Sequence, residues 1–258
     1  MTNQFRLQEF NTTRAQASCR WLLAGTALLL AWLSNPGLAA DEVVKLRPYT
    51  AQYTTTTRGL DLGLTRKLRT GADGSFTLTN GGKIMVVGFH EVSVFAVDGT
   101  RVLPRSYVYQ GTGLINRRRE VHFTRGSDTI HSLYKDQWYD LPRTDKTLDR
   151  MSQQEQVRLL LLNDPTPKED ISIQVADGKR VKDYQLVFAG EEMVETALGP
   201  VQALHFKRVH DDPERKSDMW LAPAWDYLMI KTVHIEDGEP VRVVITGASI
   251  EGVPVSAQ

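Results

Sequence analysis

The histidines are the first residues to examine for chemistry, because imidazole binds metals and transfers protons near neutral pH. The chain holds six of them: His90, His122, His131, His205, His210 and His234. No two are spaced as in the His-x-x-x-His or His-Glu-x-x-His helix motifs, which are the strong zinc signals. His205 and His210 are five residues apart, so a strand would place them on opposite faces, whereas His122 and His131 could meet across a hairpin. We predict solvated or hydrogen-bonded strand histidines, with no metal site and no cofactor.

Nucleophile motifs are also missing from the sequence. There is no Gly-x-Ser-x-Gly elbow, and the single cysteine, Cys19, lies near the N-terminus. Carboxylates such as Asp211-Asp212, Glu191-Glu192 or the pair Asp136 and Asp140 could act as acid and base only if their surroundings set their pKa values apart. Loop and surface acids are the favoured interpretation, so we predict that the protein is not an enzyme.

Three consecutive arginines, Arg117, Arg118 and Arg119, form the strongest local charge. On a strand, Arg117 and Arg119 share one face, while Arg118 and Glu120 point to the other. The favoured interpretation is a solvated strand with cross-strand ion pairs. The functional alternative is an anion or polysaccharide contact made by Arg117 and Arg119.

The elements that position these residues are mainly strands. After Val43 the apolar residues alternate with period two, as at Tyr49, Ala51 and Tyr53, which is typical of β-structure. Asp-Gly pairs, which supply the positive φ of tight hairpins, separate such segments and predict an antiparallel meander. These pairs are Asp73-Gly74, Asp98-Gly99, Asp177-Gly178 and Asp237-Gly238. The late strands are expected at Ile171–Val175, Val181–Phe188, Met193–Thr196, Val201–Val209, Lys216–Leu221, Leu228–Ile235 and Val241–Ile250.

One segment departs from the period of two and predicts a helix over about 152–162. Ser152 and Glu155 fit a capping box, the residues that follow favour helices, and Asn163-Asp164-Pro165 ends the segment. We expect this helix to lie on a sheet face or to plug the end of a curved sheet.

A cavity between such a helix and the sheet would be apolar and of ligand size. The candidates to line it are apolar residues of the helix and aromatic residues of the middle strands. They are Val157, Leu160, Leu161, Trp138 and Tyr109.

The N-terminal residues predict export. Arginines precede a 13-residue apolar run, Trp21–Leu33, and a small-residue stretch follows a Pro breaker at Gly37-Leu38-Ala39-Ala40. We predict a signal peptide over residues 1–39, cut after Ala39, and a single β-rich periplasmic domain over residues 40–258. The alternative is an uncleaved anchor, although a spanning helix needs about 20 residues. Membrane contact is expected only through the signal peptide before cleavage.

The charge of the remaining chain is nearly balanced. The leader holds three of the 31 basic and one of the 31 acidic residues, which leaves 28 and 30 and a net charge of about −2. Nucleic acid and anionic membrane surfaces are therefore not expected as partners. About 219 residues without a cysteine can bury a sufficient core without disulfides.

Short motifs spread along the chain carry a family resemblance. They are Pro48-Tyr49-x-Ala51-x-Tyr53, Asp98-Gly99-x-x-x-Leu103-Pro104, Arg118-x-x-Val121-x-Phe123, Asp149-x-x-Ser152, Glu192-x-Val194-x-Thr196-x-x-Gly199 and Trp220-Leu221. In order and spacing they resemble a family of proteobacterial exported proteins, the domain of unknown function numbered 3108, over roughly Pro48 to Ile250. Thr124 stands where that pattern has an Asp. The resemblance implies a periplasmic location and no assigned reaction.

The end of the chain also resembles, at the level of the fold, the periplasmic lipoprotein carriers. The similarity rests on Trp220-Leu221-Ala222-Pro223 and on the strands around Asp237-Gly238. In that fold a strongly curved antiparallel sheet wraps a helix and holds acyl chains between them. A likeness of fold does not by itself establish function.

The sequence therefore predicts a mainly β protein: a single strongly curved antiparallel sheet or half-barrel, with one principal helix packed on it or capping it. We expect a non-enzymatic periplasmic envelope protein that binds an apolar or amphipathic ligand, a lipid or an acylated protein, between sheet and helix. One alternative is a structural or interaction module of the envelope. The other is a hydrolase of cell-wall or polysaccharide material.

Overall fold

The computed structural model describes residues 43–57, 60–84, 86–113, 116–166, 170–236 and 238–257. The chain divides into two compact units, Met1–Ala40 and Asp41–Gln258, and every described residue lies in the second. The predicted leader over residues 1–39 and its cut after Ala39 fall outside the described residues. In the part that the structure describes, no helix combines the length and the apolar character needed to cross a membrane.

Sixteen strands of the described residues belong to one sheet, accompanied by one α-helix and one 3-10 turn. The strands before the helix are β1 (Tyr49–Thr57), β2 (Leu60–Thr70), β3 (Phe76–Ile84), β4 (Val87–Asp98), β5 (Arg101–Thr112), β6 (Arg118–Phe123), β7 (Thr129–Tyr134), β8 (Gln137–Pro142) and β9 (Thr147–Leu148). The later elements are α1 (Ser152–Asn163), β10 (Ile171–Asp177), β11 (Arg180–Thr196), β12 (Gly199–Arg208), β13 (Lys216–Ala222), η1 (Pro223–Trp225), β14 (Leu228–Glu236), β15 (Glu239–Ile250) and β16 (Val253–Pro254).

Neighbours in sequence pair antiparallel along most of the sheet, which confirms the predicted meander. The order is β8-β7-β6-β5-β4-β3-β2-β1-β15-β14-β13-β12-β11-β10-β9, and β16 pairs with β15. The first and last long strands meet in the middle, where Tyr49 lies opposite Ile250. Glycines of the four Asp-Gly pairs have the positive φ that tight turns need, between 55° and 82°. Asp237 itself lies outside the described residues.

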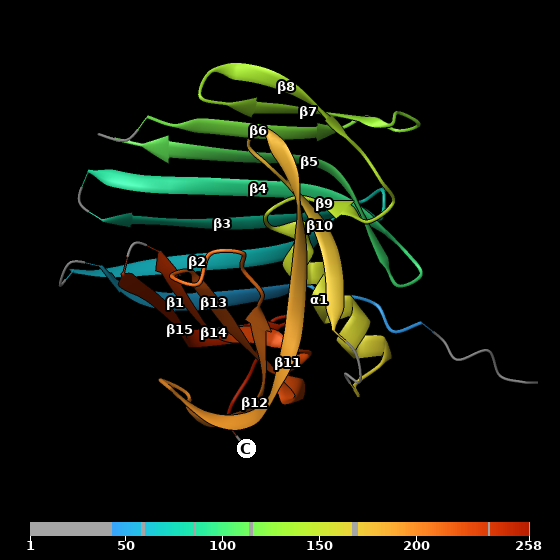
Figure 1. Ribbon diagram of the computed structural model, residues 1–258. Coiled ribbons are helices and arrows are strands. Elements are labelled where there is room, and N and C mark those ends of the chain that lie inside the picture. Colours follow the sequence, from blue (N-terminus) through green and yellow to red (C-terminus); the bar gives the residue numbers. More distant parts are fainter. Residues whose placement is uncertain are drawn as a thin grey trace, which may run out of the picture. The chain divides into compact units, whose positions relative to one another are not determined.

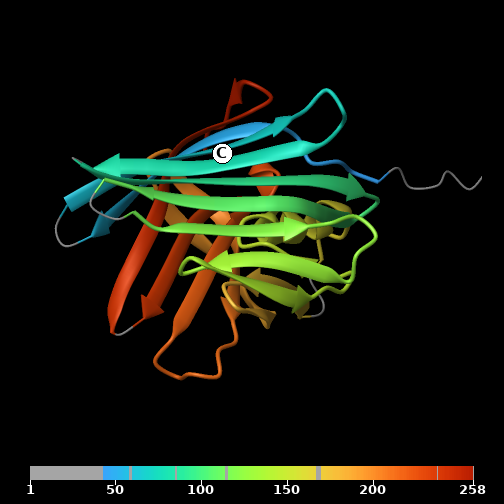
Figure 2. The same ribbon diagram turned by 90° about the horizontal axis from the view of Figure 1, so that it is seen from above.

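The sheet curves until its two ends approach each other. Strand β10 contacts β7, β11 contacts β8, and β9 contacts β5, and Ser132 Oγ on β7 donates to the Gly178 carbonyl at 2.5 Å. No ladder joins β8 to β9 in the part of the chain that the structure describes. Figures 1 and 2 show β3 to β8 running at a steep angle to the later strands. This unclosed, strongly curved sheet confirms the predicted fold class.

One strand differs from its prediction. Val181–Phe188 and Met193–Thr196 were expected as two strands, but they belong to the single strand β11. Its pairing with β12 shifts between Phe188 and Gly190, and Gly190 has a φ of 118°. A bulge at a glycine lets the ladder continue beyond a residue that would otherwise interrupt it.

Helix α1 begins and ends close to its prediction, but its cap is three residues earlier. Asp149 Oδ1 accepts the backbone N–H groups of Met151 at 2.8 Å and Ser152 at 2.9 Å. Ser152 Oγ accepts the N–H of Asp149 at 3.0 Å. The predicted box of Ser152 with Glu155 is therefore wrong, because the Glu155 carboxylate is engaged by buried cationic and phenolic donors instead.

The core lies between the helix and the concave side of the sheet. Val157, Leu159 and Leu161 of α1 are buried in one apolar cluster with strand residues such as Phe95 and Ile173. The helix contacts β4 and β5 on one side and β10 on the other. It therefore lies between the two halves of the curved sheet (Figure 1).

Candidate functional site

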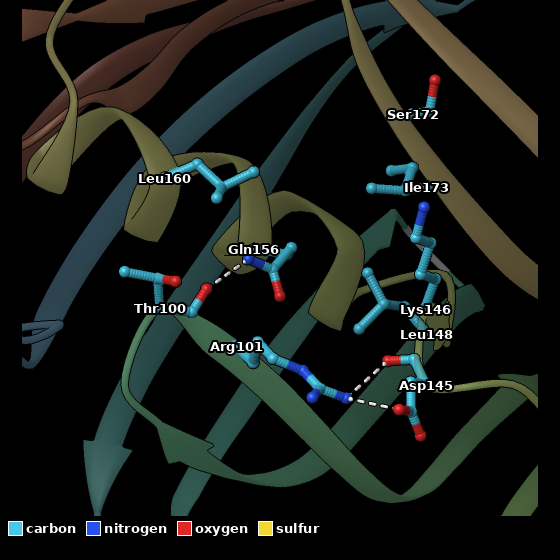
Figure 3. Close-up of a pocket in the computed structure, with 9 residues that line it drawn as sticks. All are labelled: Thr100, Arg101, Asp145, Lys146, Leu148, Gln156, Leu160, Ser172 and Ile173. Atoms are coloured by element: carbon cyan, nitrogen blue, oxygen red, sulfur yellow. Dashed lines mark hydrogen bonds and ion pairs between the residues drawn. The ribbon is translucent and has the colours of Figure 1, made fainter.

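A cavity of about 400 Å³ lies where α1 meets the two ends of the sheet. It is bounded by the turn between β4 and β5, by the segment around β9, by α1 and by β10. Its lining residues are Thr100, Arg101, Asp145, Lys146, Leu148, Gln156, Leu160, Ser172 and Ile173 (Figure 3). Its volume falls in the range of small-molecule sites, roughly 300–1,000 Å³.

Three aliphatic side chains supply the apolar part of this cavity. Leu160 comes from α1, Leu148 from β9 and Ile173 from β10. Leu148 and Ile173 are only 2 % and 5 % exposed, whereas Leu160 is half-buried. Leu160 is therefore the most accessible of the three, and accessible apolar surface in a concavity favours the apolar portion of a ligand.

Charged residues lie around the same cavity. Arg101 Nη2 donates to the Asp145 carbonyl at 3.2 Å and lies 3.5 Å from its Oδ2 atom, an exposed pair that contributes little to stability. Lys146 makes no ion pair within the described part of the chain. Two cations against one carboxylate leave the lining with a net charge of +1, which favours an anionic group.

Gln156 fixes one wall of the cavity. Its Nε2 atom donates to the Thr100 carbonyl at 2.7 Å, and its Oε1 atom accepts the Val102 N–H at 2.8 Å. The two hydrogen bonds tie the turn between β4 and β5 to the helix, and Figure 3 shows the one between Gln156 and Thr100. The wall is therefore formed before any ligand arrives, which lowers the entropic cost of binding.

A buried ionic network anchors another face of α1. Glu155 Oε1 accepts the Tyr49 hydroxyl at 2.7 Å and pairs with Arg66 at 3.4 Å. Glu155 Oε2 accepts Arg158 Nη1 at 2.6 Å, and Arg158 Nε donates to the Asp226 carbonyl at 3.1 Å. The carboxylate is fully buried, which disfavours its charge, but the positive charges of Arg158 and Arg66 outweigh burial and lower the pKa of Glu155.

The residues predicted to line a cavity lie in different places. Leu160 lines the cavity of Figure 3, while Val157 and Leu161 are buried in the core. Trp138 is 56 % exposed on β8, where its ring lies 5.8 Å from that of His122. Tyr109 lines a second, polar pocket together with both predicted anion contacts, Arg117 and Arg119.

Other residues around the cavity were not found from the sequence. Arg101 follows the turn that Asp98-Gly99 indicates. The sequence therefore predicts that Arg101 lies near a turn, but it does not predict that Arg101 lies near the helix. Lys146 and Ile173 carry no local signal, because the curvature of the whole sheet brings them to α1.

Five of the six histidines contact polar side chains close to them in the sheet. His122 and His131 lie opposite each other across β6 and β7, but His122 contacts Glu120 and His131 contacts Asp140, each at 2.7 Å. His205 lies 2.8 Å from Asp218. Within the described residues, no three His, Cys, Asp or Glu side chains are grouped to hold a metal ion.

One serine lies beside histidines, as a nucleophile would. Ser217 Oγ lies 2.7 Å from His234 Nδ1 and 3.0 Å from His210 Nε2. Its strand, β13, is paired on both sides, with Arg208 of β12 and with His234 of β14 opposite Ser217. Backbone N–H groups engaged in such ladders are not free to hold an oxyanion, so acyl transfer at Ser217 would need side-chain donors.

A family model described as "Protein of unknown function (DUF3108)" matches residues 50–246 of this chain. The match confirms the resemblance found in the motifs between Pro48 and Ile250. A search of curated proteins found no match.

One solved structure similar to this fold is the crystal structure of a β-barrel-like protein of the domain of unknown function DUF1849 from Brucella abortus. The TM-score is 0.51 at 10% sequence identity, and the alignment covers 80% of this chain and 99% of that chain. At this identity the likeness shows the fold alone. It agrees with a mainly β, barrel-like architecture.

Proposed function

This chain belongs to the DUF3108 family of proteins of unknown function, and from that premise we propose that it binds an amphipathic ligand in the cavity between α1 and the sheet ends. The ligand class is a lipid or an acylated protein with an anionic group. We further propose that the protein is an exported, non-enzymatic component of the periplasmic envelope, on the strength of the N-terminal leader pattern.

The observation that carries the proposal is the lining of the 400 Å³ cavity. An alkyl chain would contact Leu148, Leu160 and Ile173, which come from three different elements. An anionic headgroup would lie near Lys146 and Arg101. An amphiphile requires both apolar contacts for its alkyl chain and positive charges for its anionic headgroup. A helix held by a curved sheet is also the arrangement that the carrier resemblance implies.

The direct test compares two leucines of the same helix. Leu160 lines the cavity and Leu162 does not, and both are half-buried on α1. We expect Leu160→Asp to weaken binding of a fluorescent anionic fatty acid about tenfold or more, because it removes apolar contact and adds a repelling carboxylate. Leu162→Asp is expected to change the affinity less than twofold.

The control for folding is the circular dichroism spectrum and the thermal midpoint of each variant. Equal loss of binding in Leu160→Asp and Leu162→Asp, or no binding by the unaltered protein, would refute the cavity as the binding site.

Trp138 favours a second candidate function, an interaction module of the envelope. The residue is 56 % exposed on β8, the strand at one end of the sheet order. An exposed aromatic on a terminal strand is suited to contact with another protein. Crosslinking in cells that is lost in Trp138→Ala, while fatty-acid binding is absent, would favour this candidate over the first.

A further inference from the structure

A second pocket, polar and separate from the cavity of Figure 3, lies over β4, β5 and β6. It measures about 170 Å³, and its lining is Glu91, Tyr107, Tyr109, Arg117, Arg119 and Arg150. No aliphatic side chain is among these residues. Three guanidinium groups around one small concavity repel one another, and negatively charged groups close to them offset that repulsion.

Two different segments bring the arginines together. Arg119 lies on β6 and Arg117 directly precedes that strand, so the spacing of two residues places both on one face. Arg118 points away and donates to Glu120 at 2.5 Å. Arg150 comes from the segment just before α1. The third arginine is therefore supplied by the curvature that brings the helix to the sheet.

The three arginines differ in their partners. Arg119 lies 3.7 Å and Arg150 lies 3.1 Å from Asp177 Oδ1, whose other oxygen is 2.7 Å from Lys182 Nζ. Arg117 has no ion pair among the described residues, and its side chain is exposed. With Lys182 and the carboxylates of Asp177 and Glu91 included, four cations face two anions. The pocket keeps a net charge of about +2.

Beside the arginines, the lining also offers carboxylate acceptors and phenolic hydroxyl groups, since Tyr109 lies between Glu91 and Arg119 in the register of β4, β5 and β6. Glu91 Oε1 accepts the Tyr107 hydroxyl at 2.7 Å, and Glu91 Oε2 accepts Asn80 Nδ2 at 2.9 Å. Each carboxylate oxygen has lone pairs for a further donor. The Tyr109 hydroxyl makes no hydrogen bond within the described residues. Glu91 and Tyr109 suit the hydroxyl groups of a ligand, while the arginines suit its anion.

We propose that this pocket binds the phosphate group of a small polyol phosphate. The phosphate would be held by Arg117, Arg119 and Arg150, since guanidinium forks match phosphate oxygens with paired hydrogen bonds. The polyol hydroxyl groups would donate to Glu91 and face Tyr109. Such a ligand is either a free polyol phosphate or the headgroup of a phospholipid such as a phosphatidylglycerol.

The test uses the full protein as it is purified from the cells that express it, and two soluble probes. Calorimetric titration with glycerol 3-phosphate and with inorganic phosphate is expected to show one site, with glycerol 3-phosphate the tighter of the two. Arg117→Gln is expected to lower the affinity for glycerol 3-phosphate at least tenfold, because a charge-assisted hydrogen bond is lost. Arg118→Gln is the matched control and is expected to lie within twofold of the unaltered protein.

Vesicles separate the two sources of the ligand. Co-flotation with phosphatidylcholine vesicles that contain phosphatidylglycerol, lost in Arg117→Gln and kept in Arg118→Gln, would assign a lipid headgroup. Binding of glycerol 3-phosphate without co-flotation would assign a free polyol phosphate.

Two results would overturn the proposal. One is the absence of heat from either soluble probe at millimolar concentration. The other is an equal loss in Arg117→Gln and Arg118→Gln, which would reveal only a general attraction to positive charge. Because Arg117 is exposed, its variant should fold, and an unchanged thermal midpoint checks this.

Discussion

The cavity at α1 and the polar pocket over β4 to β6 have opposite chemistry. The aliphatic lining of the cavity between α1 and the sheet ends consists of Leu148, Leu160 and Ile173. Its charged residues are Arg101, Asp145 and Lys146. The pocket over β4 to β6, which we call the arginine pocket, is lined by charged and phenolic groups only. Strand β10 contributes to both, because Ile173 lines the first and Asp177 at its end binds arginines of the second.

The difference teaches how one curved sheet can offer two kinds of recognition. Apolar contact depends on close packing between elements, so the first cavity depends on the position of the helix. Charge recognition acts over a longer range, so the arginine pocket depends on how many cations lack a partner. Changes in ionic strength and at Asp177 should therefore affect the two sites differently, whereas a change at the helix anchor should affect both.

The largest effect is expected from removing the anchor of the helix. Glu155→Ala leaves the buried guanidinium groups of Arg66 and Arg158 without a carboxylate, and breaking such a buried pair lowers the free energy of unfolding by about 3–5 kcal/mol. Both sites should weaken together, since α1 shapes the first and the segment before it supplies Arg150. Urea denaturation measures the effect, and exposed Glu195→Ala is the control. A change below about 1 kcal/mol would show that the network does not hold the helix.

Acid should act through the same carboxylate. The pKa of Glu155 lies below its unfolded value, so its stabilising contribution is present above the unfolded pKa and is lost as the pH falls through the folded pKa. The unaltered protein should lose stability as the pH falls from about 5 toward 2. Glu155→Gln, already less stable at neutral pH, should lose less over that interval. Parallel curves for the two proteins would contradict this account.

Ionic strength should separate the two sites more selectively. Raising sodium chloride from about 0.05 to 0.5 M should lower the affinity for glycerol 3-phosphate roughly tenfold, because salt screens partly exposed charges. Affinity for the fluorescent fatty acid should change less, since burial of its alkyl chain is not screened and only the contact of its carboxylate with Lys146 and Arg101 is. Similar salt dependence at both sites would contradict the distinction between an apolar cavity and a charged pocket.

The smallest change in affinity, and the one most specific to the arginine pocket, is expected from a substitution of Asp177. Burial opposes its ionisation, but Arg150 and Lys182 outweigh burial, so the pKa of Asp177 is lowered and the group competes for the arginines. Asp177→Asn should raise the affinity for glycerol 3-phosphate about two- to fivefold and leave fatty-acid binding unchanged. Asp183→Asn, on the exposed part of β11, is the matched control. Weaker phosphate binding in Asp177→Asn would show that the aspartate positions the arginines rather than competing for them.

The local elements were predictable because each has a local cause. Apolar residues that alternate with a period of two predicted the strands, and the Asp-Gly pairs predicted the hairpins. The run of helix-favouring residues before Asn163 predicted α1. The spacing of Arg117 and Arg119 placed both on one face, as the shared pocket shows.

What the sequence could not provide depends on contacts between distant segments. The capping prediction at Ser152 failed because Tyr49 and Arg66, far away in sequence, engage Glu155. Arg150 reaches the arginine pocket, and Lys146 reaches the cavity, only because the sheet curves until its ends approach. Curvature accumulates from twist along the whole sheet, and no short window of residues encodes it.

The measurement that tests the central claim most directly is mass spectrometry of an organic extract of the protein, purified without detergent from the cells that express it. A stoichiometric amphiphile, lost in Leu160→Asp and retained in Leu162→Asp, is the predicted result. A folded protein that yields no lipid or other amphiphile would contradict the proposed function and would favour the interaction module.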